Sequence, residues 1–397
     1  PKSNSRNIMS VTIHQTTQDF TPSDNPIVWT FSSNQTAQTN FVYIVKLYIN
    51  NVQVATEMVS PDNGIYARFD ASAWCQNRCQ PPTISQDIIV DANNYVYCKI
   101  TVVERYGDPE TDHATASSAN IVAFKARMTD EDFIDWDCTD YIHGSGAKWL
   151  TNFPYTTISP KVRSSNESFR LMCLNNLANV TLGIKLYDDT GLIASGSYGF
   201  ASAAFEIVIA NVSPAVIVGE AIGINQTDFD NATYYTVEDT PEMTPFRIDI
   251  DRSCVYDRYR RLHFLSQWGS VEALSFGLES HVTGQVKSND YVKSFGDWDG
   301  NGSKFVFKKT QSRSVAFAKT VDKKMIVVSD WLDEDVQHWL VDNMYSSPLV
   351  WDEDLSTGSL YPRKVLNSSF THEYHDTGLL FMEQVELELT PYTSVVV

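Results

Sequence analysis

Apolar and polar residues alternate in short blocks through the first third of the chain. In one block, every second residue from Phe41 to Ile49 is apolar, so these side chains share one face of an extended strand. Asn50 and Asn51 follow, and because asparagine tolerates positive φ, the pair predicts a tight turn into a second strand. Repeated blocks of this kind predict that residues 21–127 form a two-sheet β-sandwich of fibronectin or immunoglobulin type.

A helical pattern interrupts the strands at Thr129. In the segment DEDFIDWDCTDYI, apolar residues recur three to four positions apart, behind a threonine cap and a first turn rich in acids. We therefore expect residues 128–150 to form a linker helix and loop.

Alternating runs return over residues 151–245, which we interpret as a second β domain. Asp188-Asp189-Thr190-Gly191 lies between two such runs and predicts a hairpin, because aspartate and glycine favour tight turns. The later run AVIVGEAIGI is also interpreted as a strand. A polar, proline-containing segment ends this domain near Pro241 to Pro245.

Residues 246–397 combine strands with one amphipathic helix and predict a C-terminal α+β domain. Between Leu332 and Met344, apolar residues recur along one helical stripe, and acids crowd the first turn. This helix is expected to cover a sheet. The chain as a whole is expected to be mainly β, with tandem antiparallel β-sandwich-like domains, a short linker helix and one amphipathic helix.

Residues 1–20 are polar, lack strong periodicity and predict an N-terminal arm without structure of its own. In an assembly such an arm becomes ordered on a neighbour, and Val11 to Ile13 are expected to pair with an exposed strand edge there. Removing the arm should then weaken assembly without destabilising the monomer.

Charge and composition narrow the classes of function. The 397-residue chain carries a formal net charge of −19, which opposes nucleic-acid binding because such binding depends on lysine and arginine neutralising phosphates. Its 6 cysteines are sparse for this length, so reduced thiols are expected. The sequence has neither a signal-peptide pattern nor a long apolar run, and we expect a protein made and assembled in a cytoplasm, without membrane contact.

One local pattern is similar to the start of a calcium-binding loop. Asp297, Asp299 and Asn301 supply oxygens at alternate positions, and Gly302 permits a sharp turn. The pattern fails where the loop should close with a bidentate glutamate, because Lys308 stands there. We interpret the segment as a turn at a subunit surface, keep the three oxygen-bearing residues as a weak metal candidate, and expect no cofactor.

Two other groups of residues have simpler interpretations than metal binding. His372, His375 and Asp376 lack the spacing of a metalloprotease motif and fit a polar hairpin. Cys75 and Cys79 lack a second pair with zinc-ribbon spacing, so free thiols are expected there rather than a disulfide or zinc site.

The chain has one dense basic cluster and no catalytic motif. The cluster either binds carboxylates of a neighbouring subunit or forms the solvated face of a strand pair. In the first case, the two-pronged hydrogen bonds of arginine would fix the geometry of the contact. The sequence contains no nucleophile-elbow, phosphate-loop or dinucleotide-binding motif, so we expect no enzymatic activity. The interface candidates in this cluster are Arg252, Arg258, Arg260 and Arg261.

Four stretches of the chain resemble structural proteins in the virion gene blocks of crAss-like and other Bacteroidetes phages. The resemblance implies a non-enzymatic subunit of the virion tail, a ring or baseplate-like component that forms a homo-oligomer and contacts other tail or portal-proximal proteins. The middle region takes no part in it. The four stretches are YRRLHFLSQWGSVEALSFGLES (Tyr259 to Ser280), SDWLDEDVQHWLVDNMYSSPLVW (Ser329 to Trp351), NSSFTHEYHDTGLLFMEQVELEL (Asn367 to Leu389) and NPIVWTFSSNQTAQTNFVYIVKLYINN (Asn25 to Asn51).

Two further classes of function are alternatives. One is an exported carbohydrate-binding protein of Bacteroidetes type, made of tandem β-sandwiches, which the missing signal-peptide pattern counts against. The other is a phage-borne glycan hydrolase, for which the sequence offers no recognisable acid/base pair. A closed ring would favour the tail subunit, and a monomer that retains polysaccharide would favour the first alternative.

Overall fold

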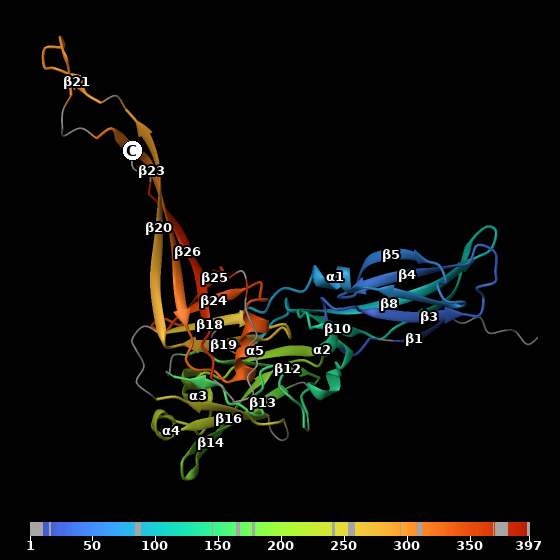
Figure 1. Cartoon of the computed structure of the whole chain (residues 1–397). Helices are drawn as coiled ribbons and strands as arrows, with labels where there is room; N and C mark the ends of the chain where they lie inside the picture. Colours follow the sequence, from blue (N-terminus) through green and yellow to red (C-terminus); the bar gives the residue numbers. More distant parts are fainter. Residues whose placement is uncertain are drawn as a thin grey trace, which may run out of the picture.

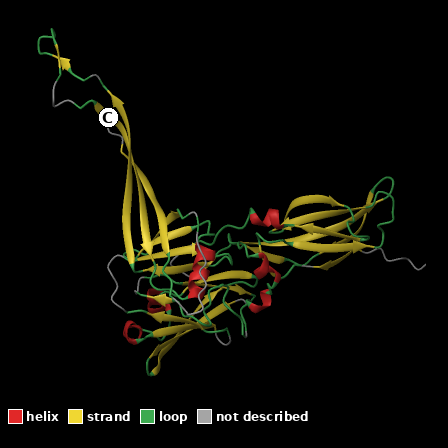
Figure 2. Ribbon diagram, viewed as in Figure 1, coloured by secondary structure: helices red, strands yellow, loops and turns green. Residues whose placement is uncertain are grey.

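Strands dominate the structure of this chain, a computed structural model (Figure 1). An N-terminal sandwich, a middle unit and a C-terminal sheet follow one another, and a long hairpin projects from the C-terminal sheet (Figure 2). The predicted fold class, mainly β with antiparallel sheets and few helices, is confirmed. The structure describes residues 11–15, 17–83, 89–144, 146–163, 167–176, 179–239, 243–252, 259–293, 295–307, 312–367, 369 and 380–394.

The N-terminal sandwich consists of two sheets, in agreement with the alternation of its sequence. From Tyr43 onward, the side chains expected on one face of β4 (Val42–Ile49) are buried between the sheets. Asn50 and Asn51 adopt φ of 50° and 64°, which confirms the predicted turn into β5 (Val52–Val59). One sheet contains β1 (Val11–Gln15), β3 (Val28–Ser33) and β6 (Tyr66–Asp70); the other contains β2 (Phe20–Pro22), β10 (Ile121–Phe124), β8 (Tyr95–Tyr106), β4 and β5, with β9 (Thr111–Ser117) on β8; the short helix α1 (Ser72–Gln76) follows β6.

The predicted N-terminal arm is wrong beyond residue 10. Val11–Gln15 form β1, which pairs with β3 of the same chain, and Val11 is buried in the sandwich. The apolar residues Val11 and Ile13, two positions apart, are enough to add a strand where β3 has a free edge, and local sequence patterns do not reveal that edge. Residues 1–10 lie outside the described part of the chain.

One sheet of the middle unit is buried on both faces. All 6 residues of β12 (Arg170–Asn175) are buried, because Leu171 packs into the core shared with the C-terminal sheet while Met172 packs toward the N-terminal sandwich. The first sheet contains β11 (Lys161–Val162), β17 (Phe246–Ile250), β16 (Tyr234–Asp239), β13 (Asn179–Asp188) and β14 (Gly191–Ala201); the second contains β12, β15 (Glu206–Asn211) and β7 (Ile89–Val90), which comes from the sandwich.

Two local predictions near the middle unit are confirmed. α2 (Asp130–Ile134) is the linker helix, and the Thr129 side chain caps it by accepting a hydrogen bond from the backbone N–H of Asp132. Asp188 to Gly191 form the turn between β13 and β14, where the Asp188 carboxylate accepts backbone hydrogen bonds from two residues of the turn. A single 3₁₀ turn, Cys138–Asp140, follows α2.

The run AVIVGEAIGI, interpreted from the sequence as a strand, is mainly helical. It contains most of α3 (Pro214–Glu220), which starts at Ser213 and Pro214 because proline fixes φ at a helical value in the first position. α4 (Gln226–Asn231) follows, closed by a capping box between Asn225 and Asp228. Both helix starts are visible in the sequence, but the β-branched residues between them favour a strand interpretation.

The predicted boundary between residues 245 and 246 lies too early. β17, which begins at Phe246, pairs with β16 and β11 of the middle unit. The C-terminal sheet begins with β18 (Arg260–Leu265) and has the order β19, β18, β24, β25, β26, β23, β20. Its other strands are β19 (Val271–Phe276), β20 (Glu279–Val292), β23 (Ser314–Val328), β24 (Val350–Asp354), β25 (Ser359–Val365) and β26 (Gln384–Ser394).

Helix α5 (Glu334–Met344) covers the C-terminal sheet, as predicted. Trp339 of α5 lies against Phe264 of β18, with ring centroids 5.3 Å apart. One hydrophobic core runs from the middle unit through α5 into β26, and another cluster, around Trp136 and Trp268, connects these parts to the sandwich. No helix within the described ranges is long and apolar enough to span a bilayer.

Candidate interaction site

The hairpin of β20 and β23 extends far beyond the C-terminal sheet (Figure 1). Its pairing runs from Glu279 opposite Val328 at the base to Val292 opposite Ser314 at the far end. At about 3.3 Å per residue, the 14 residues of β20 span about 46 Å. β26 flanks only the inner part of β23, so the outer part is a two-stranded ribbon. We call residues 279–328 the projecting arm.

One face of the projecting arm is polar and internally paired. Lys287 Nζ lies 2.7 Å from Asp322 Oδ2, and Lys324 Nζ lies 3.1 Å from Glu386 Oε2. The strand period of two places these four side chains on the same face. Such a face is compatible with water and requires no partner.

The opposite face is mainly apolar, although Lys319 and Lys323 of β23 also lie on it. Only the part of this face next to the hydrophobic core is covered. Met325 of β23 and Leu387 of β26 lie opposite each other on this face and are buried. Val282 and Val286 of β20 share the face but are 56% and 62% exposed. The projecting arm is therefore an amphipathic ribbon with an uncovered apolar side.

Aromatic rings crowd the tip of the projecting arm. Phe295 stacks on Phe307 with ring centroids 5.5 Å apart, and Trp298 meets Phe305 edge-on at 5.6 Å. Trp298 and Phe307 nevertheless remain 60% and 65% exposed. The tip thus combines an ordered ring cluster with a large exposed apolar surface. Its two short strands are β21 (Asp297–Trp298) and β22 (Phe305–Val306).

β20 also presents an open backbone edge. It pairs with β23, and the sheet order over the described ranges places no strand on its other side. Such edges pair readily with a strand of another chain, and proteins usually protect them with short strands, charges or bulges. β20 carries three charged residues, Glu279, Lys287 and Asp290, and the bulge near its outer end lies in β23, so most of its 14 residues are open to pairing.

The charge of the projecting arm is opposite to that of the rest of the chain. Residues 279–328 contain nine lysines and arginines against five aspartates and glutamates, a net charge of +4. Because the whole chain carries −19, the remaining residues carry −23. A basic, apolar ribbon therefore projects from a strongly acidic body.

The predicted turn at the tip is confirmed, and the carboxylates of the turn accept hydrogen bonds from backbone N–H groups of the same turn. Asp299 Oδ1 accepts a hydrogen bond from the backbone N–H of Ser303 at 2.9 Å, and Asp297 Oδ1 accepts one from the next backbone N–H. The hydrogen bonds from Ser303 and its neighbours lower the pKa of Asp299. Asn301 is exposed, Lys308 lies outside the described residues, and within those residues no three His, Cys, Asp or Glu side chains are grouped to hold a metal ion.

The predicted basic interface cluster is spread over separate environments. Arg252 is exposed and donates a hydrogen bond to a backbone carbonyl of α4, while Arg260 Nη1 lies 3.7 Å from Asp352 Oδ1. Arg261 is fully buried because β18 lies inside the sheet and is covered on both faces. The interface prediction is therefore wrong for Arg261, and Arg258 lies outside the described residues.

Arg261 belongs to a buried ionic junction between the middle unit and the C-terminal sheet. Its Nη1 lies 3.2 Å from Glu167 Oε2, and its Nε donates to the carbonyl oxygen of Ser168 at 2.9 Å. Glu353 of β24 accepts a hydrogen bond from the Ser168 N–H at 3.1 Å and lies 2.9 Å from His263 Nε2. These five residues, which we call the ionic junction, are all buried.

Burial and pairing determine the protonation of the ionic junction. Burial lowers the pKa of His263 to about 4, so its ring is neutral at pH 7. Burial would raise the pKa of Glu353, but the hydrogen bond from His263 and the charge of Arg261 outweigh it, and the pKa is lowered. Burial also lowers the pKa of Arg170 to about 10, which leaves it charged. Arg261 thus lies beside the carboxylates of both Glu167 and Glu353, and the charge of Arg170, which begins β12, also interacts with Glu353.

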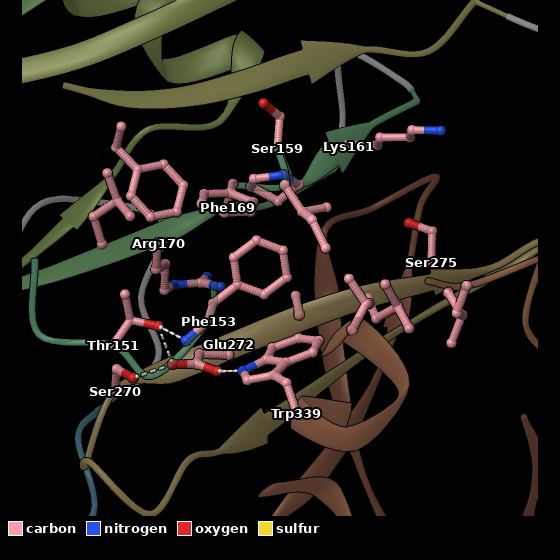
Figure 3. A pocket seen from close by; sticks show the side chains of 18 of the residues that line it. Thr151, Phe153, Ser159, Lys161, Phe169, Arg170, Ser270, Glu272, Ser275 and Trp339 are labelled. Atoms are coloured by element: carbon pink, nitrogen blue, oxygen red, sulfur yellow. Dashed lines mark hydrogen bonds between the residues drawn. The ribbon is translucent and has the colours of Figure 1, made fainter. Parts of the chain in front are cut away.

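A cavity of about 360 Å³ lies beside the ionic junction, between the middle unit and α5 (Figure 3). Glu272, at one end, accepts hydrogen bonds from Thr151 Oγ1 at 2.6 Å, Ser270 Oγ at 2.7 Å and Trp339 Nε1 at 2.6 Å. Burial raises the pKa of Glu272 despite these hydrogen bonds. Both carboxylate oxygens are already bonded, so Glu272 connects the middle unit to α5 instead of presenting a free acid to the cavity.

The remaining sequence candidates give no additional site. Cys75 and Cys79 are buried, and no described cysteine forms a disulfide. A hydrogen bond with Cys98, together with burial, raises the pKa of Cys75. His372, His375 and Asp376 fall outside the described ranges.

The sequence interpretation found the turn at the tip but missed the projecting arm around it. Two signals were available. One is a basic segment in an acidic chain, and the other is three valines at even spacings, Val282, Val286 and Val292, leading toward an Asp-Gly-Asn-Gly turn with aromatic residues on both sides. Neither signal indicates that the strands leave the sheet.

Comparisons with known proteins provide no further guide to function. No model of a known protein family matches this chain, and no curated protein matches it.

Proposed function

We propose that the protein is a non-enzymatic structural subunit of a bacteriophage virion. Within the virion, it is a ring or baseplate-like tail component that is assembled in the host cytoplasm, forms a homo-oligomer and contacts other tail or portal-proximal proteins. It requires no cofactor and acts without direct contact to nucleic acid or membrane.

The projecting arm is the observation that carries this proposal. A ribbon about 46 Å long with an apolar face and exposed rings is unfavourable in water unless another molecule covers it. Subunits of large assemblies benefit from such an extension because it reaches beyond the contact between compact bodies. The four stretches that resemble virion proteins of crAss-like phages support the same role, and one of them, Tyr259 to Ser280, leads directly into the arm.

Mass spectrometry of purified phage particles tests the proposal. The protein should be present in a stoichiometric copy number, together with tail and portal-proximal proteins. Electron microscopy of the purified chain should reveal closed rings. Absence of the chain from particles would contradict the virion role.

A carbohydrate-binding protein is the second candidate, and the exposed rings at the arm tip favour it. Trp298 and Phe307 offer apolar surface on which a sugar ring can pack. Retention of the purified protein on immobilised polysaccharide, lost in Trp298→Ser, would support this candidate. A wild-type protein that passes such a column unretarded would exclude it for the polysaccharide used.

A further inference from the structure

We propose that the projecting arm of one copy docks on the acidic body of a second copy, in a head-to-tail contact. The inference rests on the homo-oligomer of the proposed function and specifies the surfaces that form it. Three observations support it: the uncovered apolar face, the open edge of β20 and the basic charge of the arm.

Charge complementarity selects this arrangement over other contacts between identical copies. The projecting arm carries +4 and the remaining residues carry −23. Arm-to-arm contact would bring two basic surfaces together, and body-to-body contact would bring two acidic ones together. Like charges that face each other oppose association, whereas opposite charges accelerate encounter and fix register. Arm-to-body contact is the arrangement in which opposite charges meet.

The distribution of acidic residues along the chain indicates which part of the body accepts the arm. Residues 1–128 carry a net charge of only −2, whereas residues 129–278 carry −10 and residues 329–397 carry −11. The acceptor therefore lies on the middle unit and the C-terminal sheet rather than on the N-terminal sandwich. Within one chain the arm points away from both, so its own body does not cover it (Figure 1).

A head-to-tail contact also has a defined consequence for assembly. Each copy donates one arm and offers one acceptor surface, so every copy has two neighbours. Repetition of such a contact gives a ring if the rotation closes and a filament if it does not. The apolar face and the tip rings provide the buried area, and the surrounding lysines and arginines provide steering.

Reversing charges on the arm tests the contact. Glutamate at three exposed basic positions changes the net charge of the arm from +4 to −2 and should weaken self-association by about tenfold or more in sedimentation velocity. Raising the ionic strength from about 0.05 M to about 0.5 M should weaken the wild-type assembly as well. A control with the same change in net charge on the sandwich should assemble normally. The arm variant is Lys293→Glu, Lys304→Glu and Arg313→Glu, and the control is Arg68→Glu, Arg78→Glu and Lys99→Glu.

Mixing the chains distinguishes head-to-tail docking from pairing between two arms. The arm variant retains the acidic acceptor surface but cannot donate its own arm. An excess of the variant should therefore bind the arm at the end of a wild-type assembly, stop its growth and shorten it. A wild-type chain that stays monomeric at all concentrations, an arm variant that assembles as well as wild type, or assemblies that the variant does not cap would each overturn the proposal.

Two controls keep these outcomes interpretable. Melting temperatures establish that each variant is folded. If the charge variant unfolds, the double variant Trp298→Ser with Phe307→Ser replaces it, and self-association should again weaken by about tenfold or more. Failure of the proposed function is separate, because absence from phage particles would remove the virion role while head-to-tail assembly of the purified chain would persist.

Discussion

The ionic junction and the projecting arm distribute charge and apolar surface in opposite ways. In the ionic junction, ionised groups that usually face water are buried and lie beside opposite charges. On the projecting arm, aromatic and aliphatic side chains that usually lie in a core face water. The groups of the first region are paired within one chain, whereas the second leaves apolar surface that no other described part of the chain covers.

The two regions are mechanically connected through one sheet. β18, which carries Arg261 and His263, and β23, which forms the inner strand of the arm, belong to the same seven-stranded sheet. Buried charges lose much of their mutual attraction when they separate, so the ionic junction holds the middle unit in a fixed position against this sheet. The sheet from which the arm projects is therefore tied to the middle unit through the ionic junction.

Breaking the ionic junction should have the largest effect on stability. Glu353→Ala would leave Arg261 and His263 buried without their shared carboxylate, and removal of one member of a buried ion pair costs about 3–5 kcal/mol. Denaturant unfolding measures this loss. Glu279→Ala, which removes an exposed carboxylate at the base of the arm, is the matched control and should change the free energy of unfolding by less than about 0.5 kcal/mol. Equal losses of unfolding free energy in both variants would contradict the difference between the buried ionic junction and the exposed base of the arm.

Acid should weaken the ionic junction through His263. The ring has a pKa of about 4 in the folded protein against 6.5 in the unfolded chain, so the unfolded chain binds more protons between these values. Stability should therefore fall as the pH drops from 6.5 to 4, by about 3 kcal/mol from this group. The lowered pKa of Glu353 adds a loss at lower pH, while the raised pKa of Glu272 acts in the opposite direction.

Melting temperatures measured as a function of pH check this prediction. His263→Gln should flatten the dependence between pH 6.5 and 4, because glutamine does not titrate. His281→Gln, on the exposed base of the arm, should retain the wild-type profile. A profile unchanged by His263→Gln would assign the acid sensitivity to another group.

Removing one donor from the buried carboxylate beside the cavity should have an intermediate effect. Trp339→Phe keeps an aromatic ring but loses the 2.6 Å hydrogen bond to Glu272, and a hydrogen bond to a charged group contributes about 1.5–3 kcal/mol. Unfolding of both single variants and of Trp339→Phe with Glu272→Gln gives the coupling between the two side chains. Additive losses would mean that the indole N–H does not stabilise the carboxylate.

Local patterns predicted the parts of the fold that depend on neighbours in sequence. The turn at Asn50 and Asn51, the hairpin at Asp188 and the cap at Thr129 each need only a few consecutive residues, and all are present. The amphipathic stripe of α5 likewise identified which side of the helix is buried. In these segments, residue type and spacing determine the conformation directly.

Long-range contacts determined the parts that the sequence did not reveal. Arginine usually lies at a surface, but Arg261 is buried because Glu167, 94 residues earlier, meets it in the folded chain. The strand at Val11 requires the free edge of β3, and the projecting arm requires that β20 and β23 continue past the end of their sheet. Single-sequence patterns contain no information on which edges meet.

Changing the rings at the arm tip should have the smallest effect on the stability of the monomer. This result would sharpen the contrast between the buried ionic junction and the exposed projecting arm. Trp298→Ser with Phe307→Ser removes side chains that are more than half exposed and lie outside the three cores, so the free energy of unfolding should change by less than about 0.5 kcal/mol. Binding of a hydrophobic dye to the folded protein should fall, because the exposed apolar surface is smaller. Phe264→Ser, which removes a fully buried ring from the sheet below, should cost at least about 3 kcal/mol. A comparable loss of stability in the tip variant would mean that the ring cluster stabilises the single chain, and the arm would then be complete without a partner.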